Sequence, residues 1–227
     1  MLHTLKNDVL QITVDDHGAE LKSITGISDG TEYLFNGDPN WWKYSSPVLF
    51  PIVGKLVGNK YRVDGKEYEL PGHGFGRISD YDCIREQDDE LVFALDWSEK
   101  TLEVYPFKFR LKISYVLIKN QVKVMWTVKN KDDKTMYFSI GAHPAIRCPI
   151  VDGEDFDDCF LEFNVSEKAD LLPLDPSGPL TRERVPALNG KILKLNYDIF
   201  KDDALVFDSL KSDEVSLRSR KRDRKST

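Results

Sequence analysis

The sequence predicts an all-β fold, a large antiparallel β-sandwich, because its dominant hydrophobic period is two and no segment carries a convincing apolar stripe at helical spacing. Apolar residues occupy the odd positions from Phe107 to Leu117, and the residues between them begin as polar ones. A second alternating run covers residues 122–128, after the polar turn at 119–121. Together these runs predict an antiparallel hairpin with one face in water.

The other predicted strands are shorter and are separated by turns rich in glycine, proline and aspartate. A second hairpin is expected from residues 61–63 and 67–70, because Asp64-Gly65 tolerates the positive φ angles of a tight turn. The helix-like stretch at 98–104 is short, and residues 164–200 are expected to form a long loop region. Further strands are predicted at residues 9–14, 20–24, 91–97, 136–140, 159–163, 204–208 and 215–218.

Length and charge narrow the class of protein. The chain has 227 residues, 41% of them hydrophobic, which is enough for one sizeable core, so we expect a single β-sandwich domain over residues 1–227. The net charge of −6 argues against a general affinity for nucleic acid or anionic membrane. The basic residues from Arg218 onward resemble a nucleic-acid patch, but we expect them to be the solvated end of a last strand. The acidic residues within 152–158 lack calcium-loop spacing and are expected to form a solvated loop.

The cysteines and the N-terminus indicate the cell compartment. Cys83, Cys148 and Cys159 share no C-x-x-C spacing, so neither a disulfide framework nor a zinc knuckle is expected, and a reducing cytosol fits better. The N-terminus shows no apolar signal-peptide core, and the longest apolar run, 47–53, is far shorter than the ~20 residues of a membrane helix. We therefore expect a cytoplasmic protein that partners neither nucleic acid nor membrane.

Four histidines are candidates for proton transfer near neutral pH. His3 and His17 lie in polar terminal or turn contexts and are expected to be plain surface residues. His73 lies among three glycines at 72–76, which let the backbone turn tightly and approach a ligand closely. His143 follows two small residues and precedes a rigid proline, at the end of a predicted strand.

His73 and His143 also have structural explanations. His73 could cap a carbonyl in a glycine-rich turn, and His143 could be a satisfied core histidine at a strand end. As a pair they suggest general acid–base chemistry. Without a third ligand or an H-x-H spacing, they do not indicate a metal site.

Residues 41–56 place tryptophan and tyrosine beside polar side chains. Such a segment suits a sugar, whose C–H faces stack on aromatic rings while its hydroxyls need donors and acceptors. The alternative is that the tryptophans simply belong to the core.

Four segments carry a resemblance to a known family: residues 46–55, 73–77, 139–144 and 203–207. In order and interval they resemble the aldose 1-epimerase (galactose mutarotase) superfamily, and within it the LacX-like branch. The resemblance implies a large antiparallel β-sandwich with a sugar cleft. The implied reaction interconverts the α and β anomers of an aldohexose by ring opening and reclosure. It implies no cofactor and no metal, because only protons move.

The resemblance also assigns roles to individual residues. His143 would be the general acid at the ring oxygen, and His73 would bind the sugar beside it and help to hold charge. Asp203 would bind sugar hydroxyls. Lys55 stands where many relatives carry arginine, and Arg77 would line the cleft. Cleft arginines bind phosphate in the hexose-6-phosphate epimerase branch, so a phosphorylated hexose is an alternative substrate.

The general base is where this sequence departs from the family pattern. The resemblance places a glutamate in a late strand, several dozen residues after the aspartate matched by Asp203, but the sequence stops at Thr227. We therefore expect a sequence truncated at its C-terminus, lacking the base and some strands. One alternative is a non-catalytic carbohydrate-binding sandwich, and another is an interaction module without a sugar site. The expected partner is a small sugar, with the choice of hexose and the oligomeric state left open.

Overall fold

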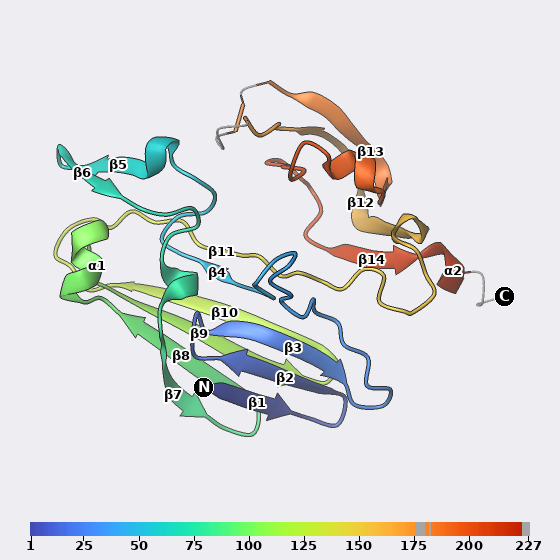
Figure 1. The fold of residues 1–227 in the computed structure, drawn as a ribbon, viewed down its shortest axis with the longest axis horizontal. Coiled ribbons are helices and arrows are strands. Elements are labelled where there is room, and N and C mark those ends of the chain that lie inside the picture. The colour runs from blue at the N-terminus through green and yellow to red at the C-terminus, as the bar shows by residue number, and fades with distance from the viewer. Residues whose placement is uncertain (176–179, 182, 224–227) are drawn as a thin grey trace. The chain divides into compact units, whose positions relative to one another are not determined.

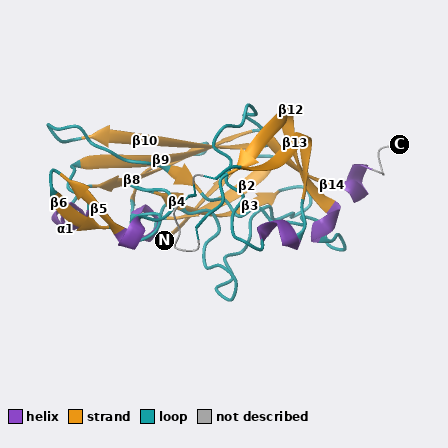
Figure 2. Ribbon diagram, turned by 90° about the horizontal axis from the view of Figure 1, so that it is seen from above, coloured by secondary structure: helices purple, strands orange, loops and turns teal. Residues whose placement is uncertain are grey.

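Antiparallel strands make up most of the regular structure in the computed structural model, as the period-two pattern predicts (Figure 1). Colouring by secondary structure shows strands joined by loops and short helices (Figure 2). The structure describes residues 1–175, 180–181 and 183–223. The chain divides into two compact units, Met1–Arg147 and Cys148–Thr227. The all-β prediction is confirmed, and the single domain over 1–227 stays a prediction.

Two antiparallel sheets dominate the first unit. The first has the order β1-β2-β3, and its strands are Leu2–Lys6, Leu10–Asp15 and Glu20–Gly26. The second has the order β10-β9-β8-β7. In chain order, the strands of the second sheet are β7 Asp82–Glu86, β8 Glu90–Asp96, β9 Phe109–Ile118 and β10 Gln121–Asn130.

The core of the first unit lies between these two sheets. Along β9, buried residues such as Phe109 and Ile113 alternate with partly exposed ones, as the sequence predicts. Ile12 of β2 and Phe93 of β8 belong to the same apolar cluster. The Tyr115 hydroxyl of β9 donates a 2.8 Å hydrogen bond to the carbonyl of Ala19, which precedes β3. The two sheets therefore form a two-layer sandwich.

Both predicted hairpins and the short helix are confirmed. Strand β10 pairs with β9 from Gln121 opposite Ile118. Strands β5 Lys60–Val63 and β6 Lys66–Glu69 close around Asp64 and Gly65, which have φ angles of 50° and 80°. Helix α1 begins after Ser98, whose side chain forms a capping box with Thr101. The bounds of α1 and the smaller elements are α1 Glu99–Val104, β4 Val48–Leu49, β11 Gly141–Ala142, η1 Val57–Asn59 and η2 Gly76–Ile78.

The second unit is built on one long strand. Strand β12, Cys159–Leu171, pairs antiparallel with β13, Val185–Lys194, and with β14, Val215–Ser219. Phe163, Ala169 and Leu188 form its small buried cluster. The helical elements of this unit are η3 Phe156–Asp158, η4 Tyr197–Phe200 and α2 Arg220–Asp223. In the described part of the chain, no helix has the length and apolar character needed to cross a bilayer.

Three predictions about elements are wrong. Residues 136–140 and 204–208 form no strand in the described structure, and β12 and β13 fill much of the region 164–200 that was expected to be loop. Residues 136–140 are held by isolated contacts such as the 2.9 Å bond from the Ser139 N–H to the Pro51 carbonyl. Pro186 is tolerated inside β13 because β13 lies at a sheet edge, where a missing backbone donor costs little.

The N-terminal strand corrects the expectation for His3. Strand β1 alternates exposed and buried residues, so His3 points inward and is only 8% exposed. His17 lies at the surface, as predicted. Strands β1 and β7 were not predicted, because both are short, partly charged edge strands with a weak hydrophobic pattern.

The basic ending and the acidic segment of the second unit contact each other. Lys221 Nζ lies 2.6 Å from the carboxylate of Asp158, and Arg218 pairs with Glu162. The predicted last strand is present as β14, and α2 follows it. Arg224 and Lys225, also part of the basic ending, lie outside the described residues.

The glycine-rich segment 72–76 runs close to the backbone of Phe50. Gly74 forms an isolated parallel bridge with Phe50 and has a φ of 69°. A Cβ placed on Gly74 would lie only 2.3 Å from the Phe50 carbonyl oxygen. The Gly76 N–H donates to that same carbonyl at 2.8 Å. A side chain at position 74 would therefore meet a backbone clash as well as a left-handed conformation.

We expect Gly74→Ala to destabilise the protein more than Gly58→Ala. Gly58 has a similar φ of 60°, but a Cβ there would meet nothing within 4 Å, so its substitution should cost only the conformational term of about 1–2 kcal/mol. Gly74→Ala should cost at least ~1 kcal/mol more, because the Phe50 backbone must move. Urea denaturation of both variants measures the difference, and equal stabilities would contradict the close approach.

Candidate functional site

The structure brings His73 and His143 together. Their ring centroids lie 5.8 Å apart, with the ring planes at 53°. His73 lies in the loop after β6, and His143 directly follows β11, so the chain places 69 intervening residues between two neighbouring imidazoles. Both belong to the first unit.

The position of His143 is set by pairing between β4 and β11. Gly141 pairs with Leu49 and Ala142 with Val48, and the His143 N–H donates to the Pro47 carbonyl at 3.1 Å. The prediction that His143 is a satisfied core histidine is wrong, because the residue is exposed. Its imidazole lies against the Trp42 ring, with 4.7 Å between centroids.

His73 is held by a reciprocal pair of hydrogen bonds with Gly54. The His73 N–H donates to the Gly54 carbonyl at 2.7 Å, and the Gly54 N–H donates to His73 Nδ1 at 3.1 Å. Because Nδ1 accepts, the proton of the neutral ring lies on Nε2. His73 has a φ of 66°, which is unfavourable for a residue with a side chain. Such strain is retained where surrounding contacts enforce it, often at functional sites.

Arg77 and Lys55 supply positive charge to the site. The Arg77 guanidinium lies 4.8 Å from the Tyr44 ring centroid, in a cation–π contact, and its Nη2 donates to the Gly72 carbonyl at 3.0 Å. Lys55 is exposed, and its Cγ lies beside Gly72, 3.1 Å from where a Cβ would stand. Arg77 therefore also fixes the loop that carries His73.

Burial and nearby cations favour the neutral form of both imidazoles. Burial lowers the pKa of His73 below its usual value, and the positive charges of Arg77, His143 and Lys55 lower it further. His143 is exposed as a residue, but the partial burial of its ring and the Arg77 charge lower its pKa in the same direction. Every charged side chain that shifts the pKa of either ring in the described structure is thus cationic. A neutral imidazole pair beside two cations suits a polar ligand or an anionic one.

The aromatic segment 41–56, which the sequence marks as suited to a sugar, contributes Trp42 and Tyr44 to the site. Trp42 is half-buried and contacts both the His143 imidazole and the Tyr44 ring. The Tyr44 ring in turn forms the cation–π contact with the Arg77 guanidinium. Trp41 is 84% exposed, so the explanation that these tryptophans are core residues is wrong for it. The two-residue spacing of Trp42 and Tyr44 was the available signal, since side chains two apart in an extended segment share a side.

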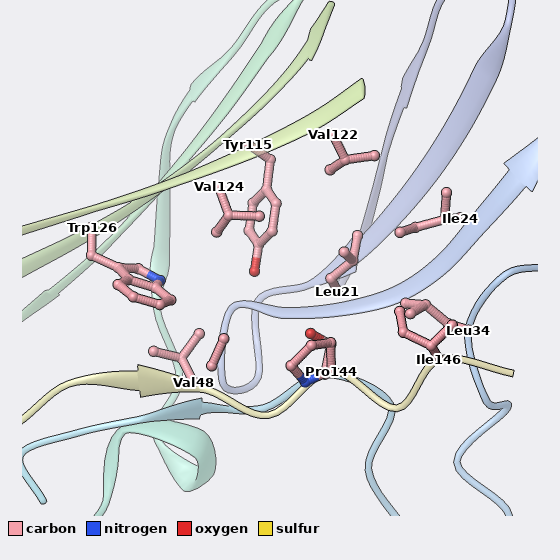
Figure 3. A pocket seen from close by; sticks show the side chains of 12 residues that line it. Leu21, Ile24, Leu34, Val48, Tyr115, Val122, Val124, Trp126, Pro144 and Ile146 are labelled. Carbon is pink, nitrogen blue, oxygen red and sulfur yellow. The ribbon is translucent and has the colours of Figure 1, made fainter. Parts of the chain in front are cut away.

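An apolar cavity of about 170 Å³ adjoins the chain on either side of His143 (Figure 3). Ala142 and Pro144, which flank His143, line it together with Val124 and Trp126 of β10 and Leu21 of β3. Its lining is almost entirely apolar, so it offers little hydrogen bonding to sugar hydroxyls. The polar groups that suit a sugar are those around the imidazole pair.

Asp203 lies in the second unit, just after η4. It has a φ of 91°, and its carboxylate accepts a 2.7 Å hydrogen bond from the N–H of Ala204. The role that the resemblance assigns to Asp203 stays a prediction.

The chain is similar to known proteins over nearly its whole length. The family model described as aldose 1-epimerase matches residues 1–225. The chromosomal protein LacX of Lactococcus lactis subsp. lactis is 35% identical over 226 residues, covering 96% of this chain and 75% of that relative.

Solved structures agree in fold. The X-ray structure of a galactose mutarotase related enzyme from Lactobacillus acidophilus matches with a TM-score of 0.92 at 35% identity, covering 97% of this chain and 74% of that one. A galactose mutarotase-like protein from Lactobacillus casei ATCC 334 matches with a TM-score of 0.89 at 28% identity, covering 97% and 76%. The match over residues 1–225 and the identity to LacX confirm the predicted resemblance: the chain belongs to the aldose 1-epimerase family.

Proposed function

We propose that the site around His73 and His143 binds an aldohexose and interconverts its α and β anomers. The observation that carries this proposal is the juxtaposition of the two rings, 5.8 Å apart, in two segments that lie within the family match. Trp42 offers an aromatic face for the C–H groups of the sugar, and the imidazoles offer hydrogen bonds to its oxygens.

The reaction needs one proton delivered and one removed. Protonated His143 gives its proton to the ring oxygen as the bond between that oxygen and C1 breaks, while a base takes the proton of the C1 hydroxyl and a carbonyl forms. Rotation about the C1–C2 bond and the reverse transfers close the ring on the other face. His73 donates a hydrogen bond from Nε2 to a sugar oxygen, since its Nδ1 is engaged by Gly54. His143 would be the general acid, and His73 would position the sugar.

The lowered pKa of His143 sets the sign of the pH dependence. The acid form exists below the pKa, so the fraction of protonated His143 at neutral pH is smaller than for an ordinary histidine. A rate that depends on this acid form therefore falls as pH rises through that lowered pKa. An anion bound beside the ring raises the pKa of His143 and increases the fraction of its acid form, and a sugar phosphate near Arg77 would supply such a charge.

A second candidate is a sugar-binding protein without catalysis. The observation that favours it is the absence of any described carboxylate among the charges that shift the pKa of either imidazole. A base for the C1 hydroxyl would be expected to appear there. In this candidate the same residues hold a sugar and the anomers exchange at the rate of the free sugar.

Optical rotation separates the two candidates. Freshly dissolved α-glucose, α-galactose and their 6-phosphates are mixed with the protein, and we expect at least one to mutarotate faster than in buffer. His143→Ala should lose roughly 10²–10⁴-fold in rate, the range for a missing general acid. His17→Ala, which removes an exposed histidine paired with Asp80, should keep it. Sugar binding in a calorimeter without any rate acceleration supports the binding protein and rejects the enzyme.

The aromatic contribution is tested by a pair of neighbouring tryptophans. Trp42→Ala should weaken sugar binding about 2- to 10-fold, which corresponds to the ~0.5–1.5 kcal/mol of an aromatic contact. Trp41→Ala should leave affinity unchanged, because Trp41 is 84% exposed and has no ring contact with either histidine among the contacts described. Calorimetric titration with the sugar that gives the strongest signal measures both, and equal losses would contradict the role of Trp42.

The charges around the imidazoles are tested by NMR titration of the histidine ring protons. Arg77→Gln should raise the pKa of both His73 and His143, because Arg77 lowers both. Lys55→Gln should raise the pKa of His73 alone, since Lys55 acts on that ring only. A change in the pKa of His143 in Lys55→Gln would contradict this arrangement of charges. So would unchanged pKa values of both rings in Arg77→Gln.

A further inference from the structure

His3, Cys83 and Glu86 converge at one side of the first unit. His3 belongs to β1 and the other two to β7, which are edge strands of the two different sheets. One ring nitrogen, the thiol sulfur and one carboxylate oxygen all lie within 4.8 Å of one another. The first and last of these are in direct contact, with His3 Nδ1 3.0 Å from Glu86 Oε2.

An irregularity in β7 creates this convergence. In a regular strand, residues 83 and 86 would point to opposite faces, because side chains alternate. The pairing of β7 with β8 shifts register between Cys83 and Arg85, so that Cys83 lies opposite Phe93 and Glu86 opposite Leu91. Phe93 and Leu91 are two residues apart in β8 and both are buried, so Cys83 and Glu86 come to the same side. Bulges commonly re-aim side chains at functional positions.

The His3 imidazole is held rigidly in place. The residue is 8% exposed, and its ring packs edge-on against Phe93, with 5.3 Å between centroids. Its Nε2 is buried and has no hydrogen-bond partner among the described residues. The polar contact of the ring is therefore made through Nδ1 to a carboxylate that is itself 55% exposed. The carboxylate side offers an open route for a small ion.

We propose that His3, Cys83 and Glu86 bind a divalent transition-metal ion of the zinc class. Nitrogen, thiolate and carboxylate oxygen are the ligand types that zinc takes in proteins. Ligand atoms about 2.0–2.3 Å from a tetrahedral ion lie roughly 3.3–3.6 Å apart, so rotations of the Cys83 and Glu86 side chains are enough to close the present separations. The ion would join the edge of one sheet to the edge of the other.

Charge and proton balance agree with this assignment. Burial raises the pKa of the Cys83 thiol, which is protonated without metal, so binding releases the thiol proton to solvent as the sulfur–metal bond forms. The proton that His3 Nδ1 shares with Glu86 moves to Nε2 of the same ring, which leaves the Nδ1 lone pair for the ion. Asp16 lies close enough for its charge to act on both Cys83 and His3. The Met1 ammonium pairs with Asp16, and Glu86 supplies the carboxylate in direct contact with His3. Solvent completes the fourth position.

Cobalt provides the test, because a thiolate bound to Co²⁺ gives a charge-transfer band in the near ultraviolet. We expect reduced, chelator-treated protein to develop this band with one equivalent of Co²⁺ and to lose it when Zn²⁺ is added. Zn²⁺ at 100 times its dissociation constant should raise the Tm by roughly 5–10 °C. Absence of the band in the unaltered protein overturns the proposal.

Matched variants assign the ligands. Cys83→Ser should abolish the band and Glu86→Gln should weaken Co²⁺ binding at least ~10-fold. Cys148→Ser, in the second unit, and His17→Gln, which removes a histidine bonded to Asp80, should keep the band. Circular dichroism checks that each variant folds. Glu86 is exposed, so we expect Glu86→Gln to fold, and it tests the metal site if Cys83→Ser is unfolded. A band that survives Cys83→Ser, or unchanged affinity in folded Glu86→Gln, contradicts the site.

Discussion

The backbone of residues 48–50 connects the core to both candidate catalytic histidines. The Phe50 ring is fully buried and packs against the rings of Phe75 and Phe109, at 6.0 and 5.2 Å between centroids. Its carbonyl accepts the N–H of Gly76, which anchors the loop of His73, while the preceding strand β4 pairs with β11 and so carries His143. Because an aromatic core is closely packed, the position of this short strand is fixed. The strand in turn fixes the positions of the two imidazoles through its hydrogen bonds.

Two kinds of interaction thus meet at the site. Packing and backbone hydrogen bonds set where the rings lie, whereas burial and Arg77 lower the pKa of both rings and Lys55 lowers that of His73. Arg77 belongs to both, since it lowers the pKa of each imidazole and also bonds the Gly72 carbonyl next to His73. Geometry and electrostatics are therefore coupled through one side chain, and a change at Arg77 acts on both.

Sequence periodicity predicted the elements whose burial alternates regularly, above all β9 and β10, and the Asp64-Gly65 turn located the second hairpin. It could not predict features that depend on partners distant in the chain. From the sequence, His3 is a polar residue near the terminus, and only the pairing of β1 with β2 shows that it points inward. The register shift in β7 interrupts the two-residue alternation on which strand prediction relies. The family resemblance pointed to His73 and His143, which the structure brings together, and the aromatic segment 41–56 pointed to a sugar, while the contact with His143 shows that Trp42 is the tryptophan at the site.

The reciprocal pair between Gly54 and His73 has a consequence for ligand choice. With Nδ1 occupied by the Gly54 N–H, a neutral His73 presents only a donor, so the ligand atom that it meets must be an acceptor such as a hydroxyl, ring or phosphate oxygen. The ammonium of an amino sugar has no lone pair to offer, and it would also be repelled by Lys55 and Arg77. In the proposed sugar site, the Gly54 N–H would thus favour ligands that present an oxygen acceptor to His73.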